Sequence, residues 1–133
     1  AQPITAAPPA AVDSGAVVGG AFDGGDGYRT TLQQAINPGQ AVSGRLPTDI
    51  EGHNYVYAGR AGQKIEAVVA SDGVSDLRVK LIDPAGTKVA QADGGDAGST
   101  ERLSYTLPAD GSYTIRIDAW TPGGYTITLT VTG

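Results

Sequence analysis

Residues 112–132 read Ser-Tyr-Thr-Ile-Arg-Ile-Asp-Ala-Trp-Thr-Pro-Gly-Gly-Tyr-Thr-Ile-Thr-Leu-Thr-Val-Thr, and this stretch decides the fold class. Apolar and polar side chains alternate on both sides of Pro122-Gly123-Gly124. Because successive side chains of a strand point to opposite faces, the pattern predicts two strands, each with one buried and one solvent-exposed face. The predicted core side chains are Tyr113, Ile115, Ile117, Tyr125, Ile127, Leu129 and Val131.

Runs of the same kind recur from residue 40 onward at intervals of about 8 to 14 residues, the spacing of a sandwich or barrel. Leu77, Val79 and Leu81 alternate with Arg78 and Lys80, which are predicted to face water. We therefore predict an all-β protein with eight strands, at Gln40–Leu46, Asn54–Gly59, Gln63–Ser71, Asp76–Ile82, Thr87–Ala92, Arg102–Leu107, Ser112–Ala119 and Gly124–Thr132.

Turn signals separate these runs. Asp83-Pro84-Ala85-Gly86 predicts a type I turn, since proline presets φ and glycine closes the turn. Ala109-Asp110-Gly111 and Pro122-Gly123-Gly124 are predicted to join neighbouring strands as hairpins. Twenty glycines and eight prolines interrupt every helical pattern, and Gln33–Ile36 is the nearest approach to one.

Composition excludes several classes of protein. The 133 residues make one domain, and the net charge is −5 with scattered Lys and Arg, which disfavours nucleic acid as a partner. The sequence holds no run of 18 apolar residues, so no membrane insertion is expected. It also contains no cysteine, which removes disulfides and thiolate sites.

The opening Ala1-Gln2-Pro3 is typical of a chain cut behind a small residue by a signal peptidase, although a shortened chain would begin in the same way. We therefore expect a secreted, extracellular or cell-surface protein. Residues 1–30 are rich in Ala, Pro and Gly and cannot bury enough apolar surface to fold alone. They are predicted to form an extended tail before a sandwich domain at residues 31–133.

Several motifs stand in a characteristic order. These are Gly44-Arg45-Leu46, Asp49, Tyr55-Val56-Tyr57, Ala61 to Ile65, Ser75 to Gly86 with its Asp-Pro-Ala-Gly turn, and Tyr105 to Ile115 with Leu-Pro-Ala-Asp-Gly-Ser-Tyr. In this order and spacing, residues from about Gln40 to Thr132 resemble the bacterial pre-peptidase C-terminal domain.

The resemblance implies an antiparallel, jelly-roll-like β-sandwich with an accessory role. Members of that family are usually appended to secreted proteases and other hydrolases, and relatives bind collagen or carbohydrate. No protease domain precedes the matching residues here, so either the parent has been cut away or the module stands alone.

Catalysis is not expected. A Ser-His-Asp triad would have to use His53, which is the single histidine and is predicted to lie exposed in a loop, and the sequence lacks a Gly-x-Ser-x-Gly elbow. Most carboxylates lie in glycine-rich turns, where they commonly stabilise the turn itself. The chain is therefore predicted not to be an enzyme.

Calcium is the one candidate cofactor. The motif Asp-Gly-Gly-Asp occurs twice, with Asp23 and Asp26 in the first copy and Asp93 and Asp96 in the second. Flexible glycines let carboxylates converge on a hard cation. Neither copy matches an EF-hand loop, and turn formation alone also explains both.

A candidate ligand face contains Trp120, Tyr55 and Tyr57. Trp120 either stacks on a sugar ring or a partner's proline, or closes the core as a lid at a corner of the sandwich. The threonines from Thr126 to Thr132 lie on a single strand, so they are read as an ordinary polar face with good strand propensity rather than as an ice-binding surface.

Two functions follow from the sequence. In the first, copies of the chain assemble into a filament or surface layer when the tail adds a strand to the open edge of another copy, a contact that does not close on itself. The apolar residues for this contact are Ile4, Val12, Val17, Val18 and Phe22. The alternative for the tail is that it wraps its own sandwich. In the second, the chain is a targeting module of a secreted hydrolase that binds extracellular protein or polysaccharide near Trp120.

Overall fold

A computed structural model describes residues 29–133 of the chain, and they form nine strands. The strands are β1 (Arg29–Ala35), β2 (Ala41–Leu46), β3 (Glu51–Gly59), β4 (Lys64–Ser71), β5 (Asp76–Ile82), β6 (Lys88–Ala92), β7 (Glu101–Thr106), β8 (Gly111–Thr121) and β9 (Gly123–Thr132). No helix of these residues has the length and hydropathy needed to cross a membrane. The predicted all-β class is confirmed.

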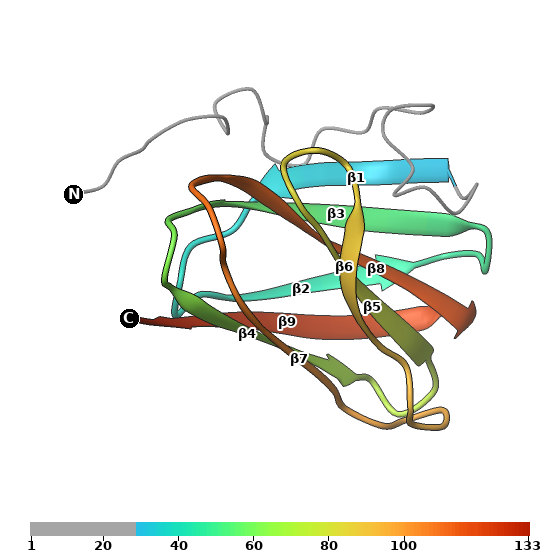
Figure 1. Cartoon of the computed structure of the whole chain (residues 1–133). Coiled ribbons are helices and arrows are strands. Elements are labelled where there is room, and N and C mark those ends of the chain that lie inside the picture. The colour runs from blue at the N-terminus through green and yellow to red at the C-terminus, as the bar shows by residue number, and fades with distance from the viewer. Residues whose placement is uncertain (1–28) are drawn as a thin grey trace.

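The strands make two sheets that pack face to face (Figure 1). One sheet has five strands in the order β1-β3-β8-β5-β6, and the other has four in the order β2-β9-β4-β7. The predicted sandwich is therefore confirmed, and the eight predicted strands correspond to β2 through β9, with differences of at most three residues at their ends.

The core lies between the sheets and is built from the alternating side chains that the sequence indicated. Ile115 and Ile117 of β8, Ile127 and Leu129 of β9, and Val79 of β5 are fully buried in one hydrophobic cluster. Their polar neighbours point to the outer faces, as a period of two requires. The inward register of all three strands is as predicted.

The turns differ from the prediction in what they join. Asp83 forms the expected turn, since its backbone oxygen accepts from Gly86 N at 2.9 Å and its Oδ1 accepts from Ala85 N at 3.0 Å and Thr87 N at 2.9 Å. This turn joins β5 and β6, which pair with each other. The predicted hairpins at Ala109-Asp110-Gly111 and Pro122-Gly123-Gly124 are wrong, because β7, β8 and β9 alternate between sheets at these corners.

Strand β1 was not predicted, and it begins at Arg29, one residue before the predicted end of the tail at residue 30. It pairs in parallel with β3 along the edge of the five-stranded sheet, so that sheet is not purely antiparallel (Figure 1). Leu32 packs against the core from this edge, and a register irregularity between Thr30 and Leu32 interrupts the pairing.

Candidate binding surface at one end of the sandwich

Three large apolar side chains are exposed among the residues that the structure describes, and all three lie at one end of the sandwich. Ile50 is 58% exposed, Val74 is 61% exposed and Trp120 is 58% exposed. We call these three residues the apolar end. Isolated exposed apolar residues are ordinary on protein surfaces, whereas a group of them indicates a contact surface.

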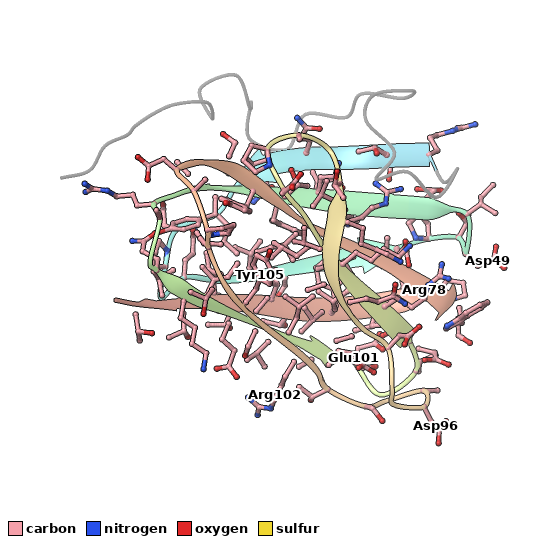
Figure 2. The ribbon with its side chains drawn as sticks, viewed as in Figure 1. Asp49, Arg78, Asp96, Glu101, Arg102 and Tyr105 are labelled. Atoms are coloured by element: carbon pink, nitrogen blue, oxygen red, sulfur yellow. The ribbon has the colours of Figure 1, made fainter. Side chains whose placement is uncertain are left out.

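The pairing of the strands brings them together. Gly52 of β3 pairs with Asp118 of β8 at the end of their antiparallel register, so Ile50, two residues before Gly52, and Trp120, two residues after Asp118, both lie at this end of the sheet. Asp76 pairs with Thr121, which places the β4–β5 turn that carries Val74 beside the end of β8. Figure 2 shows Asp49, the neighbour of Ile50, and Arg78 at this same end of the molecule.

The indole ring of Trp120 is held in place by the side chain of Arg78. The Arg78 guanidinium lies 4.3 Å from the centre of the indole ring, within the range of a cation–π interaction. Arg78 Nε in turn donates to Asp118 Oδ1 at 2.7 Å, and Lys80 Nζ donates to Asp118 Oδ2 at 3.0 Å. Asp118 is completely buried, so the indole rests on a rigid ion pair rather than on a mobile surface side chain.

Asp72 fixes the turn that carries Val74. Its Oδ1 accepts from Val74 N at 2.9 Å and from Ser75 N at 3.1 Å, and its Oδ2 accepts from Gly124 N at 2.8 Å. These backbone hydrogen bonds, more than nearby Arg45, hold the pKa of Asp72 at about 2. One carboxylate thus ties the β4–β5 turn to the start of β9, just beyond Trp120.

His53 lies at a different place from the one predicted. It sits inside β3, buried, and its Nδ1 is 2.6 Å from Tyr125 Oη, whose oxygen is 2.5 Å from Tyr55 Oη. The prediction of an exposed loop histidine is wrong because Gly52 and Asn54, its neighbours, belong to the strand and not to a turn. Burial lowers the pKa of His53 to about 4, so the ring is neutral at pH 7.

The candidate ligand face is corrected at one residue. Tyr55 is fully buried between the sheets, so it cannot contact a ligand at the surface. Tyr57 is half-buried and donates to Gln63 Oε1 at 3.0 Å, so its hydroxyl is bound to the turn between β3 and β4. Trp120 is exposed and does not close the core, so the core-lid reading is wrong.

The second Asp-Gly-Gly-Asp motif forms a loop between β6 and β7. Asp93 and Asp96 are exposed, and Gly95 N donates to Glu101 Oε2 at 3.0 Å across the loop. Within residues 29–133, no three His, Cys, Asp or Glu side chains are grouped closely enough to hold a metal ion. Asp23 and Asp26 lie outside the described residues, as do Ile4, Val12, Val17, Val18 and Phe22 of the tail.

A second surface feature lies on the outer face of the four-stranded sheet. It is a polar hollow of about 200 Å³ lined by Lys64, Glu66, Ser104, Thr130 and Thr132. None of these lining residues is aromatic, so the hollow offers no ring on which a ligand could stack. Thr130 and Thr132 belong to the threonine-rich strand, whose outer face is polar as expected.

Sequence reasoning missed the charged cluster beneath Trp120. Arg78 and Lys80 were predicted to face water, and they do point to the outer face of the five-stranded sheet, but both are buried there. Arg116 and Asp118 lie beside them on β8 and are fully buried. The sequence does place cations, Arg78 and Lys80, on one alternating strand and a carboxylate, Asp118, on another. This placement indicates a charged cluster only once the two strands are known to pair.

Comparison with known families gives one match. Residues 55–119, from the middle of β3 to near the end of β8, match the family model of the bacterial pre-peptidase C-terminal domain. None of the functionally curated proteins matches the sequence. The matched segment contains Arg78, Lys80, Arg116 and Asp118.

Solved structures share the fold at low sequence identity. The pre-peptidase C-terminal domain of a collagenase from Bacillus anthracis superimposes with a TM-score of 0.62 at 14% identity, over 74% of this chain and 94% of that domain. CorA, a surface-associated copper-binding protein of Methylomicrobium album BG8, gives 0.60 at 8% identity, over 77% and 100%. PliG from Aeromonas hydrophila, a periplasmic inhibitor of g-type lysozyme, gives 0.55 at 16% identity, over 76% and 99%.

Sequence and fold agree. The family pattern occupies the centre of the chain, and the sandwich built around it has the fold of a solved member of that family. Domains of this kind are non-catalytic accessory modules of secreted proteases. Residues 55–119 of the sandwich therefore match the bacterial pre-peptidase C-terminal domain in sequence, and the sandwich around them has the fold of that domain.

Proposed function

We propose that this domain is a non-catalytic binding module that acts outside the cell and attaches to an extracellular protein through the apolar end. The observation that carries the proposal is the gathering of Ile50, Val74 and Trp120 at one end, with no comparable group elsewhere in residues 29–133. The accessory role of the family and the extracellular or periplasmic setting of its members and structural neighbours support it.

The chemistry of this end favours protein over polysaccharide. Trp and Arg are the residue types that contribute most at protein interfaces, and here they form one stacked unit, Trp120 on Arg78. Ile50 and Val74 add aliphatic surface, which packs against protein side chains better than against sugar hydroxyls. Asp72 and Asp118 fix the surface before binding, and this lowers the entropy lost when a partner docks.

The test is retention of the 133-residue chain on insoluble collagen and, in parallel, on chitin and cellulose. We expect retention on collagen, and Trp120→Ala should weaken it by at least about tenfold, equivalent to about 1.4 kcal/mol. Arg102→Ala is the matched control, since it removes a large exposed side chain from the opposite sheet.

Two outcomes would contradict the proposal. Equal retention of the parent chain and Trp120→Ala would remove Trp120 from the contact, and Trp120-dependent retention on chitin or cellulose alone would assign the surface to a polysaccharide. The single tryptophan gives a second readout, because its fluorescence emission should shift to shorter wavelength when a partner covers it.

We infer a second candidate function, assembly of identical chains into an extracellular filament or surface layer. The observation that favours it is the set of open edges in the described sandwich, at β1 and β6 of one sheet and at β2 and β7 of the other. Such edges present unpaired backbone groups that another chain can extend. The tail would add the strand, with Val17, Val18 and Phe22 as its apolar anchors.

Electron microscopy of the full chain tests the assembly candidate. Regular fibres are expected, and the Val17→Asp, Val18→Asp double variant should remain monomeric because, whichever of the two side chains faces the partner, a charge replaces an apolar contact. Fibres that persist in this variant, or a full chain that stays monomeric at high concentration, would refute strand donation by the tail.

A further inference from the structure

The loops that surround the apolar end are acidic. Four connections between strands lie at this end, at residues 47–50, 72–75, 93–100 and 122. They contain no Lys or Arg and four exposed carboxylates, which are Asp49, Asp72, Asp93 and Asp96. Two of the same connections carry Ile50 and Val74, so the acids directly border the exposed apolar side chains.

The opposite end of the sandwich lacks this charge. Its four connections, residues 36–40, 60–63, 83–87 and 107–110, hold one cation and two carboxylates, which are Arg60, Asp83 and Asp110. At the apolar end, the neighbouring strand residues add three carboxylates and three cations, which cancel in net charge. They are Glu51, Asp76, Glu101, Arg29, Arg45 and Arg102. Negative charge is therefore concentrated at the end that exposes apolar surface.

The acids lie on both sides of Trp120. Strand β8, which carries Trp120, runs between β3 and β5. Asp49 lies in the loop before β3, whereas Asp96 belongs to the β6–β7 loop, which is held against the β4–β5 turn because Gly98 N donates to Ser75 O at 2.9 Å. Figure 2 shows Asp49 and Asp96 at the same end of the molecule.

The fold itself neutralises little of this charge. Among residues 29–133, the side chains of Asp49 and Asp96 take part in no hydrogen bond or ion pair. Arg45 lies 3.9 Å from Asp72, but its side chain is 73% exposed, and an ion pair of this kind is weak. Asp76 Oδ1 is covered by the fold and has no hydrogen-bond partner within the described residues. The end as a whole therefore suits a partner that brings cations.

The arrangement fits cationic side chains and not a metal ion. A divalent ion needs several oxygen ligands that converge on one point. In the described part of the chain, no three His, Cys, Asp or Glu side chains lie close enough together to do this. Carboxylates spread around an apolar centre instead match single charges spread around an apolar group, as Lys and Arg supply them on a protein surface.

We propose that the partner of the apolar end is a basic segment of an extracellular protein, in which Lys or Arg side chains flank an apolar side chain. The apolar side chain packs against Trp120, and the cations face Asp49 and Asp96. The inference rests on the proposed function, because it names the partner of the same surface. Opposite charges around the contact accelerate association and exclude acidic partners.

Two soluble copolymers serve as probes, poly(Lys,Phe) and poly(Glu,Phe). Neither contains tryptophan, so the fluorescence of Trp120, the single tryptophan of the chain, reports contact at the apolar end. We expect the emission to shift to shorter wavelength with the lysine copolymer and not with the glutamate copolymer. Binding should weaken as NaCl is raised from about 0.05 M to about 0.5 M, because salt screens exposed charges.

The Asp49→Asn, Asp96→Asn double variant locates the charge contact. It should raise the Kd for poly(Lys,Phe) about three- to tenfold, because two ion pairs at the rim of the contact are lost. Asp83→Asn, Asp110→Asn is the matched control, since it makes the same change in net charge at the opposite end. Asparagine keeps the Oδ1 acceptors of both turns, so this variant should change the Kd by less than about twofold.

Three results with the copolymers would overturn the inference: no binding of poly(Lys,Phe), an equal emission shift with poly(Glu,Phe), or equal weakening in the two double variants. Retention on collagen separates this inference from the proposed function. Retention that requires Trp120 but is unchanged in Asp49→Asn, Asp96→Asn would keep the proposed function and refute the basic partner. Binding of poly(Lys,Phe) at Trp120 without retention on collagen would keep the basic partner and exclude collagen.

Discussion

At the scale of single residues, His53 shows how burial fixes a charge state. Its ring is hydrogen-bonded to Tyr125, and Tyr125 is hydrogen-bonded to Tyr55, inside the sandwich. Burial is the main reason that the pKa of His53 falls to about 4; Arg116 lowers it further and Glu51 opposes the shift. Burial also raises the pKa of both tyrosines, so the three rings form an uncharged polar chain at neutral pH.

This predicts a loss of stability in mild acid. The pKa of His53 is about 4 in the folded chain, against 6.5 for a histidine in water, so protonation favours the unfolded chain. The free energy of unfolding should therefore fall as the pH drops from about 6.5 to about 4, by at most about 3 kcal/mol. Urea titrations at about pH 7, 5.5 and 4 measure the change across this window.

His53→Gln is the matched variant, because glutamine can still bond to Tyr125 but does not titrate. Its free energy of unfolding should vary much less across the same range. Asp72 contributes little to the change in this range, since its pKa is lowered from 3.8 to about 2 and most of its contribution is lost below about pH 4. A His53→Gln variant with the full acid dependence would show that another group is responsible.

The limits of sequence reasoning are clear at this scale. Alternation correctly gave the direction in which Arg78 and Lys80 point, because direction depends on the period of the strand alone. It gave the wrong solvent exposure for both, since exposure depends on what covers the sheet. The sequence singled out Trp120, which is exposed, but the contact of Trp120 with Arg78 depends on a strand pairing that the sequence does not display.

At the scale of elements, β1 is the strand that sequence analysis missed. Its sequence, Arg-Thr-Thr-Leu-Gln-Gln-Ala, lacks a clean period of two, and Gln33–Ile36 even resembles a helical turn. The strand forms because β3 offers an edge and because Arg116 binds Thr30 from two strands away. Both causes are contacts distant in sequence, so a local pattern could not reveal them.

Thr30 should therefore contribute more to the stability of the fold than its small side chain suggests. Thr30→Val keeps the shape of the side chain but removes the oxygen that accepts from Arg116 Nη1, and it should lower the free energy of unfolding by about 1–3 kcal/mol. Hydrogen exchange should also accelerate most at the amides of β1. Thr126→Val is the control, because it loses only the exposed contact to Ser43 Oγ and should cost little. Equal losses of stability would argue against the Arg116 contact as the anchor of β1.

At the scale of the whole molecule, the layers were predictable and the order of strands within them was not. Alternation in β5, β8 and β9 required two sheets with a shared core, and this is observed. The turn residues suggested hairpins, yet β5 and β6 are the one pair of consecutive strands that bond to each other among those described. A turn sequence specifies a change of direction, whereas the choice of sheet depends on which distant strands are free to pair.

This topology predicts how the sandwich folds. Most strand pairs join segments far apart in the chain, so we expect folding in milliseconds to seconds, as for other sheets of high contact order. The β5–β6 hairpin closes a short loop and should form early, because its closure costs little chain entropy. β1 joins through distant contacts and should form late.

Stopped-flow circular dichroism of two variants tests this order. Asp83→Ala removes the side-chain acceptor for Ala85 N and Thr87 N in the β5–β6 turn, and its loss of stability should appear chiefly as slower folding. Thr30→Val should instead appear chiefly as faster unfolding, because its contact forms after the transition state. The reverse pattern would mean that β1 nucleates the sandwich, and the parallel pair of β1 and β3 would then be the part of the molecule that organises the rest.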